Sequence, residues 1–192
     1  MKIQIFRQLL LITICCLPLI ASDSCKKGKN DPDSCNGSST RRNVKILIDE
    51  LATSIDTANV INISVDSIGN LDVPEVNKES ARQEVEKKVF RITAKVHKMS
   101  KHRDGDIKIK LTNGNDLYIN CEAPNMGCTF IQNSACFSRM ERVRNWIEPR
   151  YDELEGKTVT ITGVGFIDID HRYPRNAAKN EMELHPILDI SY

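Results

Sequence analysis

The chain has 192 residues, of which 40% are hydrophobic and 28% are charged. This composition is typical of a soluble domain and excludes a multi-span membrane protein or a wholly disordered chain. The 27 basic and 26 acidic side chains nearly cancel, so no overall electrostatic field selects nucleic acid or an anionic membrane. Aromatic residues make up only 5% of the chain, which is too few for an extensive stacking or sugar-binding surface.

Residues 1–24 have the pattern of a secretory signal peptide. Lys2 and Arg7 form a basic start, and an apolar run follows from Leu9 to Ile20. That run of about 12 residues is shorter than the roughly 20 that a helix needs to span a bilayer. Small residues then follow up to Ser24. We therefore expect cleavage and export, with an uncleaved N-terminal anchor as the alternative.

Cys25 directly follows Ser24 and precedes two lysines and a polar stretch. A cysteine in this place resembles the lipid-bearing first residue of bacterial lipoproteins, although Ser22 stands where the usual motif has Leu. We expect lipidation at Cys25, with the protein in the periplasm or at the outer membrane and contacting the membrane only through this anchor. Cleavage after Ala21, which would give a free secreted chain, is the alternative. Residues 25–42 are almost devoid of apolar side chains and are expected to form a flexible tether.

Five of the seven cysteines lie beyond the predicted signal. Because exported proteins enter an oxidising compartment, disulfides are the default for these residues. The sequence predicts a bridge between Cys128 and Cys136, which would join a loop to the first turn of a predicted helix. Cys121 is expected to be a free, buried side chain on a strand. If Cys25 carries no lipid, a local Cys25–Cys35 bridge is an alternative, and no cysteine spacing favours zinc.

The segment before the main domain has a helical pattern. Val44, Leu47, Ile48, Leu51 and Ile55 recur at helical spacing and predict a helix of about three turns. Residues 61–68 are more alternating, and residues 71–79 contain a proline and have no strong period. We therefore expect residues 43–80 to form a helical extension with a connecting arm, followed by the main domain over residues 81–192.

From residue 89 onward, apolar and polar residues alternate as they do in half-buried strands. The alternation runs through residues 89–96, 107–111 and 117–121. The first two segments are separated by a polar turn, and the last two by Asn113-Gly114, a strong two-residue hairpin signal. Three consecutive antiparallel strands are therefore expected.

A helix and two more strands are expected after these three strands. Ser134 is a suitable N-cap for a helix with Phe137, Met140 and Ile147 on its apolar face, and Pro149 ends or kinks it. Further strands are expected at residues 158–162 and 184–190, separated by a long turn. Three strands, a helix and two strands is the order of an OB-type barrel. The sequence thus predicts a mostly β fold with flanking helices, a five-stranded OB-like β-barrel with an N-terminal helical extension. An open α+β sheet is the alternative.

Four segments resemble a family of small exported bacterial proteins. They are residues 89–111 with Asp104-Gly105-Asp106, residues 120–124 (NCEAP), residues 159–166 (VTITGVGF) and residues 183–188 (ELHPIL). The resemblance covers residues 71–190, and ELHPI is its most specific motif. It implies an OB-like barrel and export, and because the family has no assigned activity it carries no catalytic residue. Ile107 and Lys108 replace an aromatic residue and a histidine of the family pattern, so a ligand site there would be altered in this chain.

Two histidines and three carboxylates near the end of the predicted barrel are candidate metal ligands or acid–base groups. Glu183 and His185 would face the same side of a strand, and Asp168, Asp170 and His171 lie in the segment before it. Side chains of these types bind a divalent cation or transfer protons. We favour the structural interpretation, in which His185 hydrogen-bonds to a neighbouring strand or carboxylate. No cofactor is therefore expected, and a divalent metal is the alternative.

Basic side chains are predicted to form a stripe on the outer face of the first two strands of the barrel. The candidate polyanion-binding residues are Arg91, Lys95, His97, Lys108 and Lys110. OB folds use such stripes to bind nucleic acid backbones. Only Tyr118 lies nearby as a stacking aromatic residue, so an ordinary solvated face is the simpler interpretation.

Known catalytic motifs are absent from the sequence, including those of serine hydrolases, zinc proteases and nucleotide-binding enzymes. Asp104, Asp106, Arg142 and Arg144 supply residue types that a nuclease needs, but no characteristic spacing links them. We expect an exported, lipid-anchored binding or structural module of the bacterial envelope without catalytic activity, whose partner is an envelope ligand or protein rather than nucleic acid. The alternatives are a metal-dependent hydrolase on the same barrel and a polyanion- or nucleic-acid-binding domain.

Overall fold

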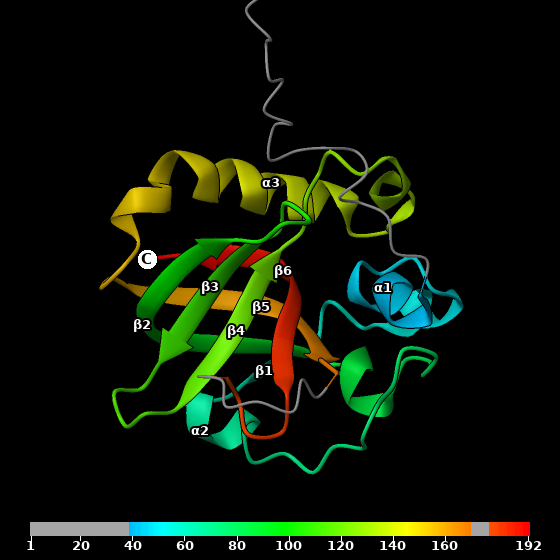
Figure 1. Ribbon diagram of the computed structural model, residues 1–192, viewed down its shortest axis with the longest axis horizontal. Helices are drawn as coiled ribbons and strands as arrows, with labels where there is room; N and C mark the ends of the chain where they lie inside the picture. Colours follow the sequence, from blue (N-terminus) through cyan, green and yellow to red (C-terminus); the bar gives the residue numbers. More distant parts are fainter. Residues whose placement is uncertain (1–38, 170–176) are drawn as a thin grey trace, which may run out of the picture.

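The computed structural model of the chain describes residues 39–169 and 177–192 (Figure 1). The predicted signal peptide, the predicted lipid-bearing Cys25 and the candidate ligands Asp170 and His171 lie outside the described residues. Among the helices that are described, none is long and apolar enough to cross a membrane.

Five strands close into a barrel in the order β2-β3-β4-β6-β5, with β5 pairing back to β2. Neighbouring strands are antiparallel except for β4 and β6, which run parallel. This order is that of the OB fold, so the predicted fold class is confirmed. The strands are β2 (Val89–Lys101), β3 (Ile107–Thr112), β4 (Tyr118–Ala123), β5 (Thr158–Ile167) and β6 (Met182–Ser191).

The barrel closes because β2 is long enough to pair with two partners. Its first half, Val89–Lys95, pairs with β5, and its second half, Lys95–Lys101, pairs with β3. The register with β3 shifts between Val96 and Lys98, and an irregularity of this kind bends a strand and increases its twist. The bend carries β2 from one neighbour to the other, and its curved ribbon is visible in Figure 1.

Alternate residues of the strands fill the interior. Ile107, Ile109 and Leu111 of β3 are fully buried, as is Cys121 of β4, which is a free thiol as predicted. The helix α3 (Phe137–Ile147) lies across one end of the barrel (Figure 1). It contributes Val143 and Ile147 to the same core.

The helix α3 is shorter at its start than the sequence predicts. Its N-cap is Cys136 rather than Ser134, because the 3-10 helix η4 (Thr129–Asn133) ends at Ser134 and the chain turns there before α3 begins. The α-helix ends at Ile147, and Pro149 lies in the first turn of a second 3-10 helix, η5 (Glu148–Glu153). The chain therefore continues as a tighter helix at Pro149.

The predicted three-turn helix in the extension is wrong. The segment forms two short pieces, α1 (Thr40–Lys45) and η2 (Glu50–Ser54), and Leu47 between them has a positive φ of 59°. Val44, Ile46 and Leu47 are buried, whereas Leu51 is 41% exposed, so the apolar residues do not form one helical stripe. The guanidinium of Arg82 donates to the carbonyl oxygen of Val44 at 2.7 Å, which takes an acceptor that a continuing helix would use.

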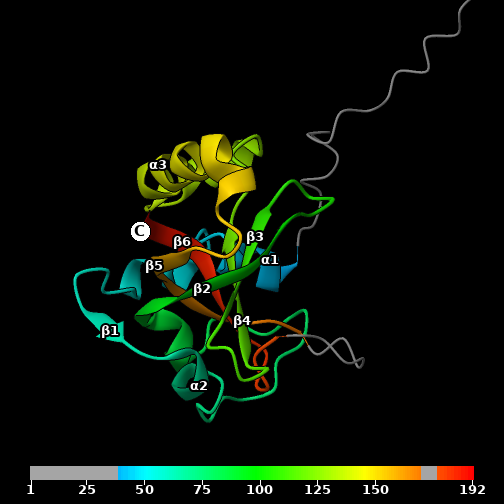
Figure 2. The same cartoon turned by 90° about the vertical axis from the view of Figure 1, so that its left-hand side faces the viewer.

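The rest of the extension is mostly irregular. Residues 61–68 form the end of a short strand, β1 (Val60–Asn62), followed by the helix α2 (Val65–Ile68). Figure 2 shows β1 at the outer side of the barrel, where it pairs in parallel with the start of β2. Residues 71–79 contain no helix or strand, as expected for a connecting arm. The 3-10 helix η3 (Glu84–Lys87) then leads into β2.

Two glycines of β5 allow the close packing that the barrel needs. A Cβ atom at Gly163 would lie 2.9 Å from Cβ of Leu184 and 3.0 Å from the carbonyl oxygen of Pro186. A Cβ atom at Gly165 would lie 2.9 Å from the ring of Phe90 and from the carbonyl oxygen of Val85. The two glycines therefore let β6 and η3 approach the backbone of β5, which is a steric role for the Gly-Val-Gly motif.

We expect the substitution Gly163→Ala to destabilise the fold by about 1–3 kcal/mol, because the added methyl group overlaps backbone atoms that cannot move freely. Urea unfolding measures this change. Gly69→Ala is the matched control, because its Cβ would have no neighbour nearer than 3.5 Å. Equal stability losses in the two variants would contradict the steric explanation.

Candidate functional site

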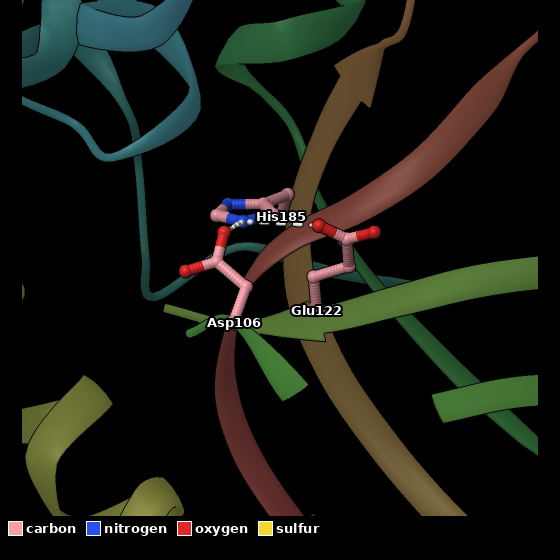
Figure 3. Close-up of side chains that lie close together, drawn as sticks. All are labelled: Asp106, Glu122 and His185. Carbon is pink, nitrogen blue, oxygen red and sulfur yellow. Dashed lines mark hydrogen bonds and ion pairs between the residues drawn. The ribbon is translucent and has the colours of Figure 1, made fainter. Parts of the chain in front are cut away.

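Three titratable side chains converge on one point outside the barrel interior: Asp106, Glu122 and His185 (Figure 3). One ligand atom from each lies within 4.8 Å of the others. The Nε2 atom of His185 is 3.4 Å from Oδ2 of Asp106 and 3.6 Å from Oε2 of Glu122. All three residues are buried. Within the described part of the chain, this is the group whose geometry suits a metal ion.

Strand pairing brings these residues together. Asp106 ends the turn between β2 and β3, Glu122 lies on β4 and His185 on β6. Cys121 and Leu184 are register partners in the parallel β4–β6 pair and face the core. Their neighbours Glu122 and His185 therefore point to the opposite side, where they meet.

Each of the three side chains is held by a contact on the side away from the convergence point. The Nδ1 atom of His185 lies 2.7 Å from the carbonyl oxygen of Lys45, which can only accept, so Nδ1 donates. Oδ1 of Asp106 accepts from the backbone amide of Asn125 at 2.7 Å. Oε1 of Glu122 lies 2.8 Å from the ammonium of Lys108. These contacts leave Nε2, Oδ2 and Oε2 facing one another.

The protonation states follow from burial and from the surrounding charges. Burial and the nearby ammonium of Lys45 lower the pKa of His185. Burial opposes ionisation of Asp106, but the contact with His185 and the charge of Lys45 outweigh it and lower its pKa to about 2. Burial likewise opposes ionisation of Glu122, and the charge of Lys45 is the largest of the effects that nevertheless lower its pKa.

The N-terminal segment covers the cluster with two cations. The ammonium of Lys45 lies 2.7 Å from Oε2 of Glu122 and 3.7 Å from Oδ2 of Asp106. The guanidinium of Arg42 lies 3.3 Å from Asp104 and 3.8 Å from Asp106. Both cations come from α1, which lies beside β6 in Figure 1. The cluster is therefore closed by the chain's own N-terminal segment.

Two further arginines attach the extension to the barrel. Arg41 pairs with both oxygens of the buried Glu86 and donates to the carbonyl oxygen of Ile167 at the end of β5. Arg82 pairs with Asp49 through two nitrogens. Breaking a buried pair of this kind by removing one partner is strongly destabilising. These ion pairs therefore hold α1 over the cluster.

Glu183 lies beside the cluster and has an unusual proton affinity. Its Oε1 accepts from the side-chain amide of Asn120 at 2.9 Å and lies 3.9 Å from the ammonium of Lys108. Burial, together with the charges of Glu122 and Asp168, raises the pKa of Glu183 to about 8. Glu183 is therefore mostly protonated at pH 7.

The structure brings together only part of the predicted metal set. His185 belongs to the convergent trio, whereas Glu183 contacts Asn120 and Lys108 instead. The carboxylate of Asp168 accepts from the amide of Ile169. Asp170 and His171 lie outside the described residues, so the full set stays a prediction.

The sequence interpretation did not join Asp106 and Glu122 to His185. Both residues occur in the segments that carry the family resemblance, but their contact depends on the parallel pairing of β4 with β6, which no local pattern reveals. The role of Lys45 was also missed. The available signal was a charged residue at an outward strand position between two inward apolar residues, such as Glu122 between Cys121 and Ala123.

The predicted basic stripe divides into two parts. Lys95 and His97 are exposed on β2, and Lys110 lies 5.9 Å from the ring of Tyr118. Arg91, in contrast, lies on the half of β2 that pairs with β5 and donates to Thr162. Lys108 is paired with Glu122. Both of these residues therefore have structural partners.

The predicted disulfide between Cys128 and Cys136 is wrong, because Cys136 is a free, half-buried thiol. Cys136 is the N-cap of α3 and lies beyond the η4 helix that begins after Cys128, so the two cysteines belong to separate short elements. Cys128 is itself disulfide-bonded, but to neither of the other two cysteines that the structure describes.

Two of the four residues whose types a nuclease needs, Arg144 and Asp104, have structural partners. Arg144 is buried, and its Nη1 donates to the carbonyl oxygens of Gly105, Ala123 and Pro124. Asp104 pairs with Arg42 rather than with Arg144. Arg144 therefore fastens α3 to the ends of β3 and β4.

Comparisons with known proteins identify no family. No protein-family profile matches the sequence, and no curated protein matches it. Among solved structures, the chain is similar to asparaginyl-tRNA synthetase of Entamoeba histolytica, with 16% identity, a TM-score of 0.40 and coverage of 69% of this chain but 23% of that one. The same enzyme in complex with asparaginyl-adenylate gives 17% identity, a TM-score of 0.39 and coverage of 70% and 23%. The chain thus spans less than a quarter of the length of these structures.

We expect the substitution Glu183→Gln to reduce the loss of stability at alkaline pH. The raised pKa of Glu183 means that its contribution to stability is fully present below the ordinary value of 4.5 and is lost as the pH rises through about 8. Glutamine stays neutral and keeps an oxygen for Asn120. Urea unfolding at pH 5, 7 and 9 should show a smaller decline for the variant, by up to a few kcal/mol.

The exposed arm residue Glu79 provides the matched control for this measurement. The variant Glu79→Gln should follow the pH dependence of the wild-type protein. Parallel curves for Glu183→Gln and the wild type would contradict the assignment of a protonated Glu183.

Proposed function

We propose that this chain is a non-catalytic OB-fold binding module of an exported, lipid-anchored protein, and that it binds an anionic polymer of the cell envelope on the outer face of β2, β3 and β4. The observation that carries this proposal is a row of exposed and half-exposed basic side chains beside the ring of Tyr118, which contacts the ring of His97 at a tilted angle. We call it the basic face, and it consists of Lys95, His97, Lys98, Lys110 and Tyr118.

Strand register supports the basic face as a continuous surface. Lys98 of β2 pairs with Lys110 of β3, and Lys95 pairs with Thr112, whose partner on β4 is Tyr118. The centroid of the Tyr118 ring lies 4.9 Å from that of His97. Cations and an aromatic ring on neighbouring strands provide charge and contact area for an extended anionic chain.

Catalysis is not favoured by the arrangement of the titratable groups. Within residues 39–169 and 177–192, the trio of Asp106, Glu122 and His185 is the group whose geometry suits a metal ion, and Lys45 and Arg42 cover it. The metal-dependent hydrolase therefore stays the weaker alternative.

Export is supported by the sequence and by one cysteine. The signal pattern and Cys25 indicate a lipoprotein, as described above. Cys128 is disulfide-bonded, which fits an oxidising compartment. An anionic envelope polymer is the partner class that an exported protein with a basic face would meet.

We expect the purified protein to bind a fluorescently labelled heparin oligosaccharide, used as a model polyanion, with an affinity that falls steeply as salt increases. The double substitution Lys95→Gln and Lys98→Gln should weaken binding at 50 mM salt by about 5-fold or more and reduce the slope of log affinity against log salt by about 1 per lysine. Fluorescence anisotropy over a salt series measures both quantities.

Lys78 in the connecting arm is exposed and lies outside the basic face, so Lys78→Gln is the matched control and should bind as the wild type does. Absence of heparin binding, or binding that salt does not weaken, would reject the basic face as a polyanion site. Tighter binding of single-stranded DNA than of heparin would indicate that the ligand is nucleic acid rather than an envelope polymer.

We expect the substitution Cys25→Ser to release the protein from the membrane fraction of cells that export it. A lipid attached to Cys25 is the proposed anchor, and serine cannot form the thioether. Metabolic labelling with a radioactive fatty acid, followed by fractionation, measures both the lipid and the location. Unchanged labelling of Cys25→Ser would contradict lipidation at this residue.

A further inference from the structure

The side chains of Asp106, Glu122 and His185 are arranged so that one possible metal-binding atom of each faces the same point. Nε2 of His185, Oδ2 of Asp106 and Oε2 of Glu122 face one another, and one donor atom of each side chain lies within 4.8 Å of the others. The remaining polar atom of each side chain is engaged elsewhere: Nδ1 with the carbonyl oxygen of Lys45, Oδ1 with the amide of Asn125, and Oε1 with Lys108. Contacts of this second kind orient the ligands of natural metal sites.

A single ammonium group does not satisfy the three converging atoms. Lys45 lies within hydrogen-bond distance of Oε2 of Glu122, at 2.7 Å, but 3.7 Å from Oδ2 of Asp106. The other neighbours of Oδ2 are Nε2 of His185 at 3.4 Å and Arg42 at 3.8 Å. Among residues 39–169 and 177–192, no hydrogen bond or ion pair to this buried oxygen is shorter than 3.4 Å, which is long for a hydrogen bond to a carboxylate.

We propose that Asp106, Glu122 and His185 form a divalent-cation site of the zinc type, and that the ammonium of Lys45 occupies the cation position in this conformation. A divalent ion and the N-terminal segment then compete for the same three ligands. The inference concerns a different surface from the basic face and does not depend on polyanion binding.

The ligand set indicates the class of ion. One imidazole nitrogen and two carboxylate oxygens suit Zn²⁺, which binds such atoms at about 2.0–2.2 Å and accepts water in an open position. An ion contacting Oδ2 and Oε2 at these distances would satisfy both carboxylates, whereas Lys45 satisfies only Glu122. Binding of the ion would remove one attachment of α1, the contact of Lys45 with Glu122. The pairing of Arg41 with Glu86 would remain.

The test is equilibrium dialysis of the purified protein against Zn²⁺, with bound zinc measured by mass spectrometry. We expect one Zn²⁺ per chain to bind Lys45→Met at least about 10-fold more tightly than the wild-type protein, a coupling typical of two competing ligands. Adding His185→Ala to Lys45→Met should abolish this site, which separates it from zinc bound by other histidines or cysteines.

Lys108→Met is the matched control. It removes the same charge from the same carboxylate, but Lys108 contacts Oε1 rather than the converging Oε2. We expect its zinc affinity to stay at or below that of the wild type, because the contact that orients Glu122 through Oε1 is lost. Equal tightening in Lys45→Met and Lys108→Met would show that only the total charge matters and would overturn the competition.

A second measurement uses the wild-type protein and remains decisive if Lys45→Met does not fold. Saturating Zn²⁺ should accelerate amide hydrogen exchange in Thr40–Lys45 but not in Phe137–Ile147, because only α1 loses an attachment. Unchanged exchange in Thr40–Lys45 at saturating zinc, or zinc that stays bound after His185→Ala, would overturn the proposal.

Discussion

The closure of the barrel through β2 is the constraint on which the rest of the structure depends. One strand pairs with β5 along Val89–Lys95 and with β3 along Lys95–Lys101, and the irregularity after Val96 allows the change of direction. Closure buries one face of every strand and turns the other face outward. It also makes β4 and β6 parallel neighbours, which places charged outward residues of two distant segments in contact.

The charge cluster shows how those outward residues are accommodated. Buried carboxylates are costly unless they are paired and hydrogen-bonded. The barrel supplies Asp106, Glu122 and Glu86, and the N-terminal segment supplies Arg41 and Lys45 as their partners. The extension is thus held by complementary charge as well as by apolar packing, and the same arrangement leaves donor atoms of three ligands facing one another. The structural attachment and the proposed metal site therefore use the same geometry.

The sequence allowed much of the fold to be predicted because the barrel strands alternate strongly. In β3, Ile107, Ile109 and Leu111 are separated by lysines, a pattern that predicts a half-buried strand. Asn113-Gly114 then predicts the turn after this strand. The extension was mispredicted because Val44, Leu47 and Leu51 have helical spacing but pack separately. The Cys128–Cys136 bridge was mispredicted because Cys128 is bonded to a different cysteine, which leaves Cys136 a free thiol.

The candidate site was only partly predictable. His185 was singled out from its motif, but its partners Asp106 and Glu122 come from positions about 60 to 80 residues earlier in the chain and are joined to it only by the β4–β6 pairing. Local residue order by itself determined the strands, the hairpin and the inward and outward faces, because these depend on neighbours a few positions apart. The tertiary structure alone decided which outward charges are buried and which ammonium covers them, because those contacts depend on the closure of the barrel and the docking of α1.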